Sequence, residues 1–390
     1  METKRLYYSD PRLSEFTATV LSCRESGDGF AAVLDRTAFY PEGGGQPCDL
    51  GTLGDAAVLS VREKDGGIVH LCDRALAAGS AVAGVIDAAR RFDLTQQHSA
   101  DHIISGVIHA RWGLENVGFH LGADTTTIDL SGALTPEQLA EAERAANEII
   151  WRDIPVQTIY PTPEQLPALD YRSKKELSGP VRLVKIEGVD LCACCGTHVL
   201  RTGEIGMIKI ISSLPFRGGT RFEMVAGKRA YDFLSRVFGQ NRENSVLLSA
   251  KPAETAQAVR RLLSERDALR AERAENEKRR CAAAAEKLAG AGDALVFMSG
   301  LSGDETRLLA IAVMEKCGGT AAVFSEADGG FVYAVGRGGG DLGALSARMN
   351  AELAARGGGR GGFIQGRAAA ERAAVEKFFA GFKIFEGDTI

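Results

Sequence analysis

The sequence predicts an α+β protein of several domains, and three observations support this. A chain of 390 residues is too long for one ordinary hydrophobic core. Short alternating apolar runs fill its first part, whereas strand and helix patterns follow one another later. A charged stretch without internal Gly or Pro, residues 253–289, interrupts the later part. We therefore expect a small β-barrel at 1–90, an α+β domain at 91–250, a helical linker at 251–290 and an α/β domain at 291–390.

The first part has the pattern of a small β-barrel or sandwich. Residues 16–21 and 56–61 alternate apolar and polar side chains, which is the period of a strand with one buried face. Gly and Asp turns separate such runs up to about Asp87.

The second part begins with a predicted helix that runs from Asp93, a suitable N-cap, to Gly113. Its apolar positions share one face and would form a core stripe: Ile104, Val107, Ile108 and Trp112. A second helix is predicted from Thr135 to Ile150, because a capping hydroxyl is followed by Pro and then by Gln at the third position. Residues 181–186 and 207–211 are candidate strands.

A helix from about Gly227 leads to Pro252, and a long helix is predicted to follow. In that long helix four residues recur at seven-residue spacing: Leu262, Leu269, Asn276 and Ala283. This spacing fits a short coiled coil whose Asn sets the register. A single linker helix fits equally well, because the apolar seam is thin. A homodimer through this helix or through the C-terminal domain is therefore one expected assembly.

The last part alternates strand-like runs, 294–298 and 320–324, with helical stretches, which indicates a separate α/β domain. Within it, glycines flank Arg360 on both sides, in the run 357–362. Such a loop would let the backbone approach a phosphate closely. A flexible lobe that joins two elements is the alternative.

Composition and cysteine usage indicate a soluble protein of a reducing compartment. Hydrophobic residues make up 45% and charged residues 25% of the chain, as in ordinary globular proteins. No run approaches the ~18 apolar residues that cross a bilayer, and the first residues lack an apolar signal region. Eight cysteines, three of them within four positions, fit metal ligands and free thiols better than a disulfide framework. We expect a cytoplasmic protein without membrane association.

A formal net charge of -5 argues against a protein that wraps nucleic acid indiscriminately. A local basic path remains possible in one stretch, formed by Lys209, Arg217, Arg221, Lys228 and Arg229. A solvated charged face is the equally good alternative.

Two short motifs nearly a hundred residues apart have the composition of one metal site. His98 and His102 are four residues apart on the predicted helix, so their side chains share a face. Cys194 and His198 repeat that spacing. Either pair alone is more often structural. Together they offer mixed nitrogen and sulfur ligands in tetrahedral number, which favours one Zn²⁺ per chain over magnesium or calcium.

The identity of the sulfur ligand and the role of the ion stay open at this level. Cys192 lies two residues before Cys194, and Cys195 follows it directly, so spacing alone does not choose among them. Four protein ligands also close a tetrahedral ion, whereas hydrolytic zinc usually keeps one position for water. The ion would then expand its coordination, exchange a ligand for substrate, or hold the pocket together.

Three stretches resemble the editing domain of alanyl-tRNA synthetase, and they occur in the expected order. Residues 190–199 resemble its zinc-binding signature, residues 90–102 its partner motif and residues 39–46 its glycine-rich motif; they read DLCACCGTHV, RRFDLTQQHSADH and FYPEGGGQ. The run GGGRGGFIQG at 357–366 is similar to the C-terminal DHHA1 domain of the same enzyme. The resemblance covers almost the whole chain and is strongest to the long form of free-standing alanyl-tRNA editing proteins, the AlaX family. This match selects Cys194 as the sulfur ligand.

The resemblance implies a zinc-dependent hydrolase that acts in trans on mischarged tRNA(Ala), with serine as the first expected substrate and glycine as the second. Polar partners for a serine hydroxyl would be left unpaired by alanine and would reject it. The chain is too short to add an aminoacylation domain to these regions, and the sequence carries no ATP-binding signature.

Further site residues are assigned around the metal motifs. Gln46 and the glycines before it would reach the metal pocket, with a plain hairpin turn as the alternative. Asp101 lies about 100° around the helix from His102 and would reach a ligand or the substrate amine, with surface exposure as the alternative. His120 lies in the region that lines the family's pocket, whereas His70 is expected to be structural. The assigned catalytic residues are Asp101, His120 and Gln46, and the assigned substrate-binding residues are Gly43, Gly44, Gly45, Gln46 and Arg221.

Two alternatives belong to other functional classes. One is a tRNA-binding or dimerisation module whose zinc is purely structural. The other is a metallopeptidase, which is disfavoured because Ser99 stands where the general-base Glu would follow the first histidine.

Overall fold

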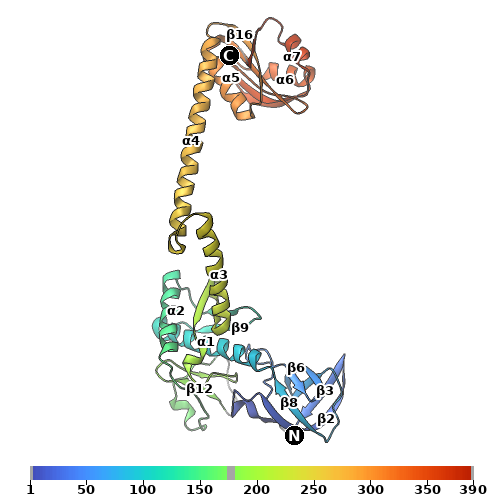
Figure 1. Cartoon of the computed structure of the whole chain (residues 1–390), viewed down its shortest axis with the longest axis vertical. Helices are drawn as coiled ribbons and strands as arrows, with labels where there is room; N and C mark the ends of the chain where they lie inside the picture. The colour runs from blue at the N-terminus through green and yellow to red at the C-terminus, as the bar shows by residue number, and fades with distance from the viewer. Residues whose placement is uncertain (1–2, 174–180, 388–390) are drawn as a thin grey trace. The chain divides into compact units, whose positions relative to one another are not determined.

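The computed structural model describes residues 3–173 and 181–387 as two compact units, Met1–Glu243 and Asn244–Ile390. Helices and several sheets occur together, so the predicted α+β multidomain class is confirmed (Figure 1). The finer division into four parts stays a prediction. Among the described helices, none combines the length and the apolarity that crossing a bilayer requires.

The chain begins with a closed barrel in which strands follow the order β2-β3-β7-β6-β5-β8 (Figure 1). Its strands are β2 Glu15–Ser26, β3 Gly29–Leu34, β5 Gly51–Leu53, β6 Ala56–Lys64, β7 Gly67–Cys72 and β8 Ala81–Ile86. Alternate side chains point inward, and the inward set forms an apolar core that includes Val20, Leu34, Val61 and Ile68. Two shorter strands, β1 Lys4–Arg5 and β4 Arg36–Thr37, pair in parallel beside a 3-10 turn, η1 Leu6–Tyr8.

The next part of the first unit contains two helices and two antiparallel sheets that share one core. The helices are α1 Ala88–Trp112 and α2 Pro136–Trp151. The larger sheet has the order β14-β15-β10-β9, with β9 Asn116–Leu121, β10 Thr126–Leu130, β14 Ile208–Phe216 and β15 Gly219–Ala226. The smaller has the order β11-β12-β13, with β11 Val156–Ile159, β12 Leu183–Ile186 and β13 Asp190–Ala193. Ile104 and Ile108 of α1 are fully buried against Phe222 and Met224 of β15.

The start of α1 corrects the sequence prediction. The N-cap is Asp87, whose carboxylate accepts the Arg90 backbone N–H at 3.0 Å. Asp93 instead lies inside the helix and accepts three hydrogen bonds from the Arg229 guanidinium. The prediction therefore took Asp93 for an N-cap because of its residue type. In the structure Asp93 is the ion-pair partner of Arg229, which is distant in sequence. The predicted end is confirmed, because Gly113 adopts the left-handed conformation with φ 65°.

Helix α2 begins as predicted. The Thr135 hydroxyl accepts the Gln138 N–H at 3.2 Å, and the Gln138 side chain accepts the Thr135 N–H at 2.8 Å. This reciprocal pair satisfies two backbone donors at the helix end. Beyond β13 the chain passes through the 3-10 turn η3 Thr202–Ile205 and, after β15, enters α3 Gly227–Leu247.

The second unit contains a six-stranded mixed sheet with the order β19-β20-β18-β17-β16-β21. The strands are β16 Gly292–Ser299, β17 Gly318–Ala327, β18 Gly330–Arg337, β19 Ala355–Arg360, β20 Phe363–Ala368 and β21 Lys383–Glu386. One buried cluster joins the sheet to α5 Gly303–Cys317 and the end of α4 Thr255–Lys287. A second cluster joins it to α6 Gly343–Glu352 and α7 Arg372–Phe378.

The glycine-rich run is a strand pair, which corrects its interpretation as a loop. Gly357 on β19 lies beside Gly366 on β20, and Gly366 lies beside Tyr333 on β18. A Cβ on Gly357 would come within 2.6 Å of the Tyr333 hydroxyl. The glycines therefore leave room for the Tyr333 ring to lie across the strands, which is a packing role.

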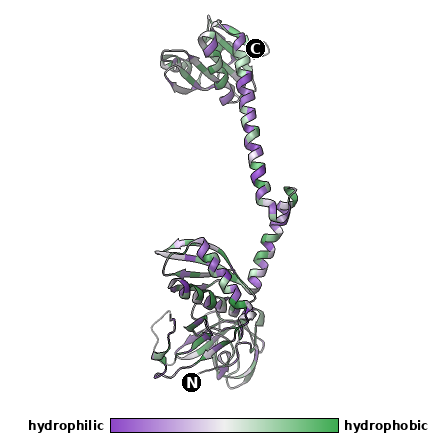
Figure 2. Ribbon diagram, turned by 90° about the vertical axis from the view of Figure 1, so that its left-hand side faces the viewer, coloured by the Kyte–Doolittle hydropathy of each residue, from purple (hydrophilic) through white to green (hydrophobic). Residues whose placement is uncertain are grey.

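Helix α4 is mostly hydrophilic along its length (Figure 2). Leu262 and Leu269 of the proposed seam are 54% and 65% exposed. The single chain thus leaves this seam uncovered, which is compatible with either predicted role of the helix.

Candidate metal centre

The two metal motifs meet in the first unit. His98 and His102 lie on α1, whereas Cys194 and His198 lie on the segment that follows β13. The four ligand atoms all lie within 4.8 Å of one another. The Cys194 Sγ is 3.3 Å from Nε2 of His98 and 3.3 Å from Nε2 of His198. These four residues, called the quartet from here on, are therefore close together in space as predicted. The three histidines of the quartet are buried.

Each histidine of the quartet has its Nδ1 held by another group. Nδ1 of His98 lies 2.7 Å from the Gln46 Oε1, and Nδ1 of His102 lies 2.8 Å from the Asp190 Oδ2. These oxygens accept hydrogen bonds, so the ring hydrogen lies on Nδ1. In the neutral ring, Nε2 then keeps a lone pair.

The third histidine follows the same pattern through a hydroxyl. The Ser99 Oγ donates to the Thr95 carbonyl at 2.8 Å, so it can only accept from Nδ1 of His198 at 3.4 Å. Outer partners of this kind fix the tautomer and the ring orientation of metal-binding histidines.

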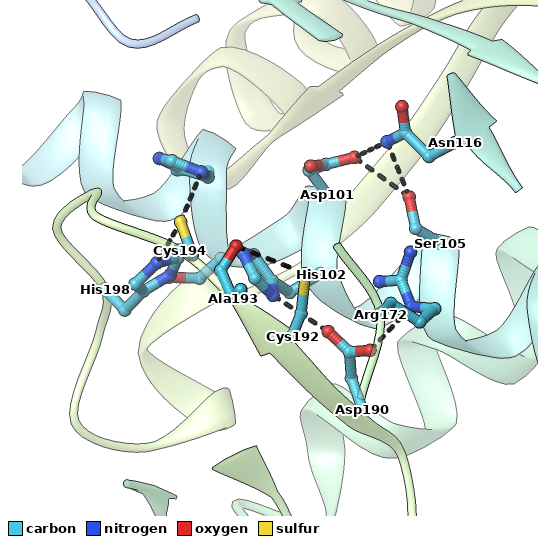
Figure 3. Close-up of polar contacts among 12 residues, drawn as sticks. Asp101, His102, Ser105, Asn116, Arg172, Asp190, Cys192, Ala193, Cys194 and His198 are labelled. Atoms are coloured by element: carbon cyan, nitrogen blue, oxygen red, sulfur yellow. Dashed lines mark hydrogen bonds and ion pairs between the residues drawn. The ribbon is translucent and has the colours of Figure 1, made fainter. Parts of the chain in front are cut away.

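Asp190, the outer partner of His102, is itself held in place by a second residue. It is buried, and its second oxygen accepts the Arg172 Nε at 2.8 Å (Figure 3). Burial by itself would raise the pKa of this carboxyl, but the hydrogen bond and charge of His102, together with Arg172, hold it below its usual range. The group is thus a carboxylate that holds one ligand ring.

The electrostatics of the quartet favour a thiolate among imidazoles. Burial would raise the pKa of the Cys194 thiol, but its electrostatic and hydrogen-bond interactions with the imidazoles of His98, His198 and His102 hold it well below the usual value. Burial lowers the pKa of His198 to about 3. Burial also opposes charge on His102, yet its bonds to Asp190 and Cys194 raise that pKa well above the usual value. The proton on His102 is the one that a metal ion would displace.

This donor set fits zinc. Zn–S bonds of about 2.3 Å and Zn–N bonds of about 2.0–2.1 Å in a tetrahedron place sulfur and nitrogen about 3.6 Å apart. The two sulfur–nitrogen separations of 3.3 Å are close to that value. Three imidazoles and a thiolate also exclude the hard oxygen-seeking cations.

The neighbouring cysteines occupy different surroundings. Cys192 is buried on β13 and forms a second potential group with His102 and Asp190. Burial raises the pKa of its thiol, which disfavours the thiolate form that a ligand needs. Cys195 is exposed. All eight cysteines are free thiols, so the expectation against a disulfide framework is confirmed.

The glycine-rich motif forms a hairpin turn and also brings Gln46 to the quartet. The two predicted alternatives, a hairpin turn and a contact with the metal pocket, are therefore both present. Gly43 and Gln46 exchange backbone hydrogen bonds at 3.1 and 3.0 Å, with positive φ at Gly44 and Gly45. Gln46 is buried, and its Nε2 donates to the Thr197 hydroxyl at 2.9 Å. A Cβ on Gly45 would lie 2.7 Å from the Phe119 carbonyl oxygen. The turn therefore sits tightly against β9 and delivers Gln46 to His98.

Asp101 is buried, not exposed, and its hydrogen bonds point away from the quartet (Figure 3). Its Oδ1 accepts from the Asn116 amide at 2.6 Å and from the Ser105 hydroxyl at 2.9 Å. The structure thus places it in a polar network between α1 and β9.

His120 and Arg221 do not join the quartet. Phe119 stacks on His98 with ring centroids 4.9 Å apart, and successive strand residues face opposite sides of a sheet. His120 therefore points to the other face of the sheet, where it is exposed. Arg221 makes a bidentate pair with Asp129 at 2.6 and 2.7 Å and lies over the Phe216 ring.

Most of the predicted basic path is paired with acidic groups. Lys209 pairs with Glu143, Arg221 with Asp129, Lys228 with Asp232 and Arg229 with Asp93. The partly buried pairs of Lys209, Arg221 and Arg229 support the interpretation of a charged structural surface over that of a strong phosphate track, whereas the Lys228 pair is exposed on both sides.

Asp190, Ser99, Thr95 and Arg172 were missed as site residues. Asp190 could have been found from the sequence, since it is the first residue of the motif 190–199 that contains the cysteines. Ser99 directly follows His98 on α1 and Thr95 lies about one turn before it, but a hydroxyl in a helix gives no chemical signal of its own. Arg172 could be found only from the tertiary fold.

Comparisons with known proteins agree with this geometry. Residues 181–229, which contain Cys194 and His198, match the family described as the threonyl and alanyl tRNA synthetase second additional domain. The chain is similar to the alanine–tRNA ligase of Halorubrum lacusprofundi, with 33% identity over 380 residues, 92% of this chain and 41% of that protein. It is also similar to the alanyl-tRNA editing protein Aarsd1 of Mus musculus, with 34% identity over 271 residues, 65% of this chain and 66% of that protein.

The region that holds the quartet matches this additional domain of tRNA synthetases. The chain is therefore a protein of the class that carries this domain. The chain spans about two fifths of the length of the ligases that it matches. Within the class, it belongs to the AlaX-like alanyl-tRNA editing proteins.

Proposed function

We propose that this chain is a hydrolase that deacylates mischarged tRNA(Ala) in trans, with serine as its first substrate and glycine as its second. One observation carries the chemistry: a half-buried cysteine sulfur and three buried imidazoles converge, with Nδ1 of each ring already engaged. The names of its relatives support the substrate class, since they act in alanyl-tRNA editing or ligation.

Zinc held by His98, His102, Cys194 and His198 would supply Lewis acidity toward the ester carbonyl or toward water. The protein's own contribution is orientation. Gln46, Asp190 and Ser99 fix the three rings, and Gly45 fixes the position of Gln46. An ester between an amino acid and a ribose hydroxyl is already reactive, so positioning and modest polarisation suffice without a covalent nucleophile.

The roles of the other assigned residues have unequal support. Gln46 is a positioning residue, because it touches a ligand ring and not the reacting atoms. Catalytic roles for Asp101 and His120, and substrate binding by Arg221, rest on the family resemblance alone, since their described contacts lead away from the ligand atoms.

The test mixes the purified protein with serine-charged, glycine-charged and alanine-charged tRNA(Ala) and follows ester loss. We expect hydrolysis of the first two and little of the third, with His102→Ala inactive. Equal inertness toward all three charged tRNAs, by protein that contains one zinc per chain, contradicts the proposal.

The second candidate is a tRNA-binding or dimerising module with a structural zinc. It is favoured by the four protein donors, which fill a tetrahedral ion, and by the uncovered leucines of α4. Chelation that abolishes folding and tRNA binding together, with no deacylation by intact protein, would select it. Comparing the solution mass and tRNA affinity of the full chain with those of residues 1–252 separates dimerisation from tRNA contact.

A further inference from the structure

Two large aromatic side chains stand exposed on the first unit beside the elements that hold the metal centre. Trp151 at the end of α2 is 70% exposed, and Tyr231 on α3 is 68% exposed. Both line a groove of about 450 Å³, together with Gln96, Ile205, Gly206, Met207, Gly227 and Lys228. Burying such rings is worth more than burying any other side chain, so leaving two in one groove calls for a partner.

Gly227 packs tightly against Gln96 in the lining of this groove. A Cβ on Gly227 would lie 2.3 Å from Oε1 of Gln96, and φ is +55° at Gly227 and +78° at Gly206. Gln96 in turn donates to the Glu204 carbonyl at 2.8 Å, which ties α1 to η3. The groove is therefore built on the same two elements that flank the quartet.

A second cavity lies beside the quartet. This cavity of about 180 Å³ is lined by the ligand His198, by Thr95 of α1 and by Glu204 of η3. Ile205, the next residue of η3, lines the aromatic groove. At about 100° per residue, Thr95 lies ~60° and Gln96 ~160° around α1 from His98. Quartet, cavity and groove thus follow one another around a helix about 10–12 Å in diameter.

A cation at the rim suits a phosphodiester chain. Lys228 lines the groove, and its pair with Asp232 is exposed on both sides, so it contributes little and leaves the cation available. Exposed aromatic faces combined with cations are the pattern with which proteins bind unpaired bases.

We propose that the Trp151–Tyr231 groove is a stacking site for unpaired nucleotides next to the 3′ end of the charged tRNA. The inference rests on the proposed function, because the aminoacyl ester at the quartet defines where the 3′ end lies. A short single-stranded segment spans the distance around α1. The bases stack on the two rings, and Lys228 at the groove meets a phosphate.

The chain offers a direct optical test, since Trp112 and Trp151 are its only tryptophans. In a Trp112→Phe background the emission reports on Trp151 alone. Titration with a single-stranded oligoribonucleotide that has the sequence of the tRNA 3′ end should quench it saturably. An abasic chain of the same length should not. Unchanged emission with the oligoribonucleotide, or equal quenching by the abasic chain, overturns the proposal.

A second measurement does not depend on the Trp112 substitution. Anisotropy of a labelled oligoribonucleotide should show about 5- to 10-fold weaker binding to Tyr231→Ala and to Trp151→Ala, the scale of one lost base stack. Tyr160→Ala, which removes another exposed ring, is the matched control and should bind normally. Equal affinities for all three variants and the wild type contradict the assignment.

Steady-state kinetics then connect the groove to catalysis. Trp151→Ala and Tyr231→Ala should raise KM for charged tRNA by a similar factor and leave kcat within about twofold. If the wild type fails to deacylate any charged tRNA, the proposed function fails while the oligoribonucleotide titrations still decide whether the groove binds bases. A fall in kcat with KM unchanged contradicts a docking role.

Discussion

Two regions of the first unit bury histidine in opposite ways. In the barrel, both ring nitrogens of His70 are occupied by the protein: Nε2 lies 2.9 Å from the Thr37 hydroxyl and Nδ1 3.3 Å from the Ala32 carbonyl. In the quartet only Nδ1 of each ring has an outer partner, and Nε2 faces the shared centre. Burial and residue type are the same in both places. The difference lies in which nitrogen is left to bind: the quartet rings keep Nε2 for a metal ion, as ligands would need, and His70 does not.

The largest expected effect follows from removing a quartet ligand. We expect His102→Ala to lower kcat/KM for serine-charged tRNA(Ala) by about 1,000-fold, because several kcal/mol of charge stabilisation depend on the ion. His70→Gln is the matched control from the barrel and should retain activity. Equal losses in both variants, measured in the same deacylation assay on folded protein, would erase the distinction between the two regions.

The second prediction concerns pH and the barrel histidine. Burial lowers the pKa of His70 to about 4 from an ordinary value of 6.5. The unfolded chain therefore takes up this proton below pH 6.5 while the folded chain does not, so stability present above pH 6.5 is lost as pH falls toward 4. The full contribution is about 3 kcal/mol. Urea unfolding of wild type and His70→Gln between pH 7 and 4 measures it, and parallel pH profiles would contradict it.

The third prediction tests the outer partners of the quartet. Gln46→Ala should weaken zinc affinity by about 10- to 100-fold, because the His98 ring loses the group that fixes its tautomer. Gln46→Glu keeps an acceptor at the same place and should restore most of the affinity. Competition with a chelator of known affinity gives the values. A loss that Glu does not rescue would mean that the side chain acts by packing alone.

The smallest effect separates two adjacent glycines of the hairpin that carries Gln46. Both have positive φ, but only a Cβ on Gly45 meets a backbone atom, the Phe119 carbonyl at 2.7 Å. We expect Gly45→Ala to cost about 2–3 kcal/mol of unfolding free energy and Gly44→Ala about 1 kcal/mol. Equal costs would show that contact with β9 does not hold the turn.

The sequence predicted which four residues come together, but not the groups that hold their rings. Helical spacing of four residues placed His98 beside His102 on α1, whereas Cys194 and His198 lie on a segment that is not helical. The groups that choose Nε2 over Nδ1 come from other elements, as Asp190 and Gln46 do, and only tertiary contacts reveal them.

Two other predictions from local sequence were wrong, because a contact with a residue distant in sequence determines the structure there. Asp93 has the preference of an N-cap but pairs with Arg229. The run around Gly357 has the composition of a loop but forms a strand, because Tyr333 needs the space. The α+β class, the α2 start and the helix end at Gly113 were predictable, since each depends on neighbours in sequence.

X-ray absorption at the zinc edge of the purified protein tests the central claim most directly. We predict one zinc per chain with one sulfur at about 2.3 Å and three imidazole nitrogens at about 2.0–2.1 Å. His102→Ala should lose one imidazole from that shell, and His70→Gln should leave it unchanged. A shell with two sulfurs, or one without imidazole, would contradict the quartet as the metal centre.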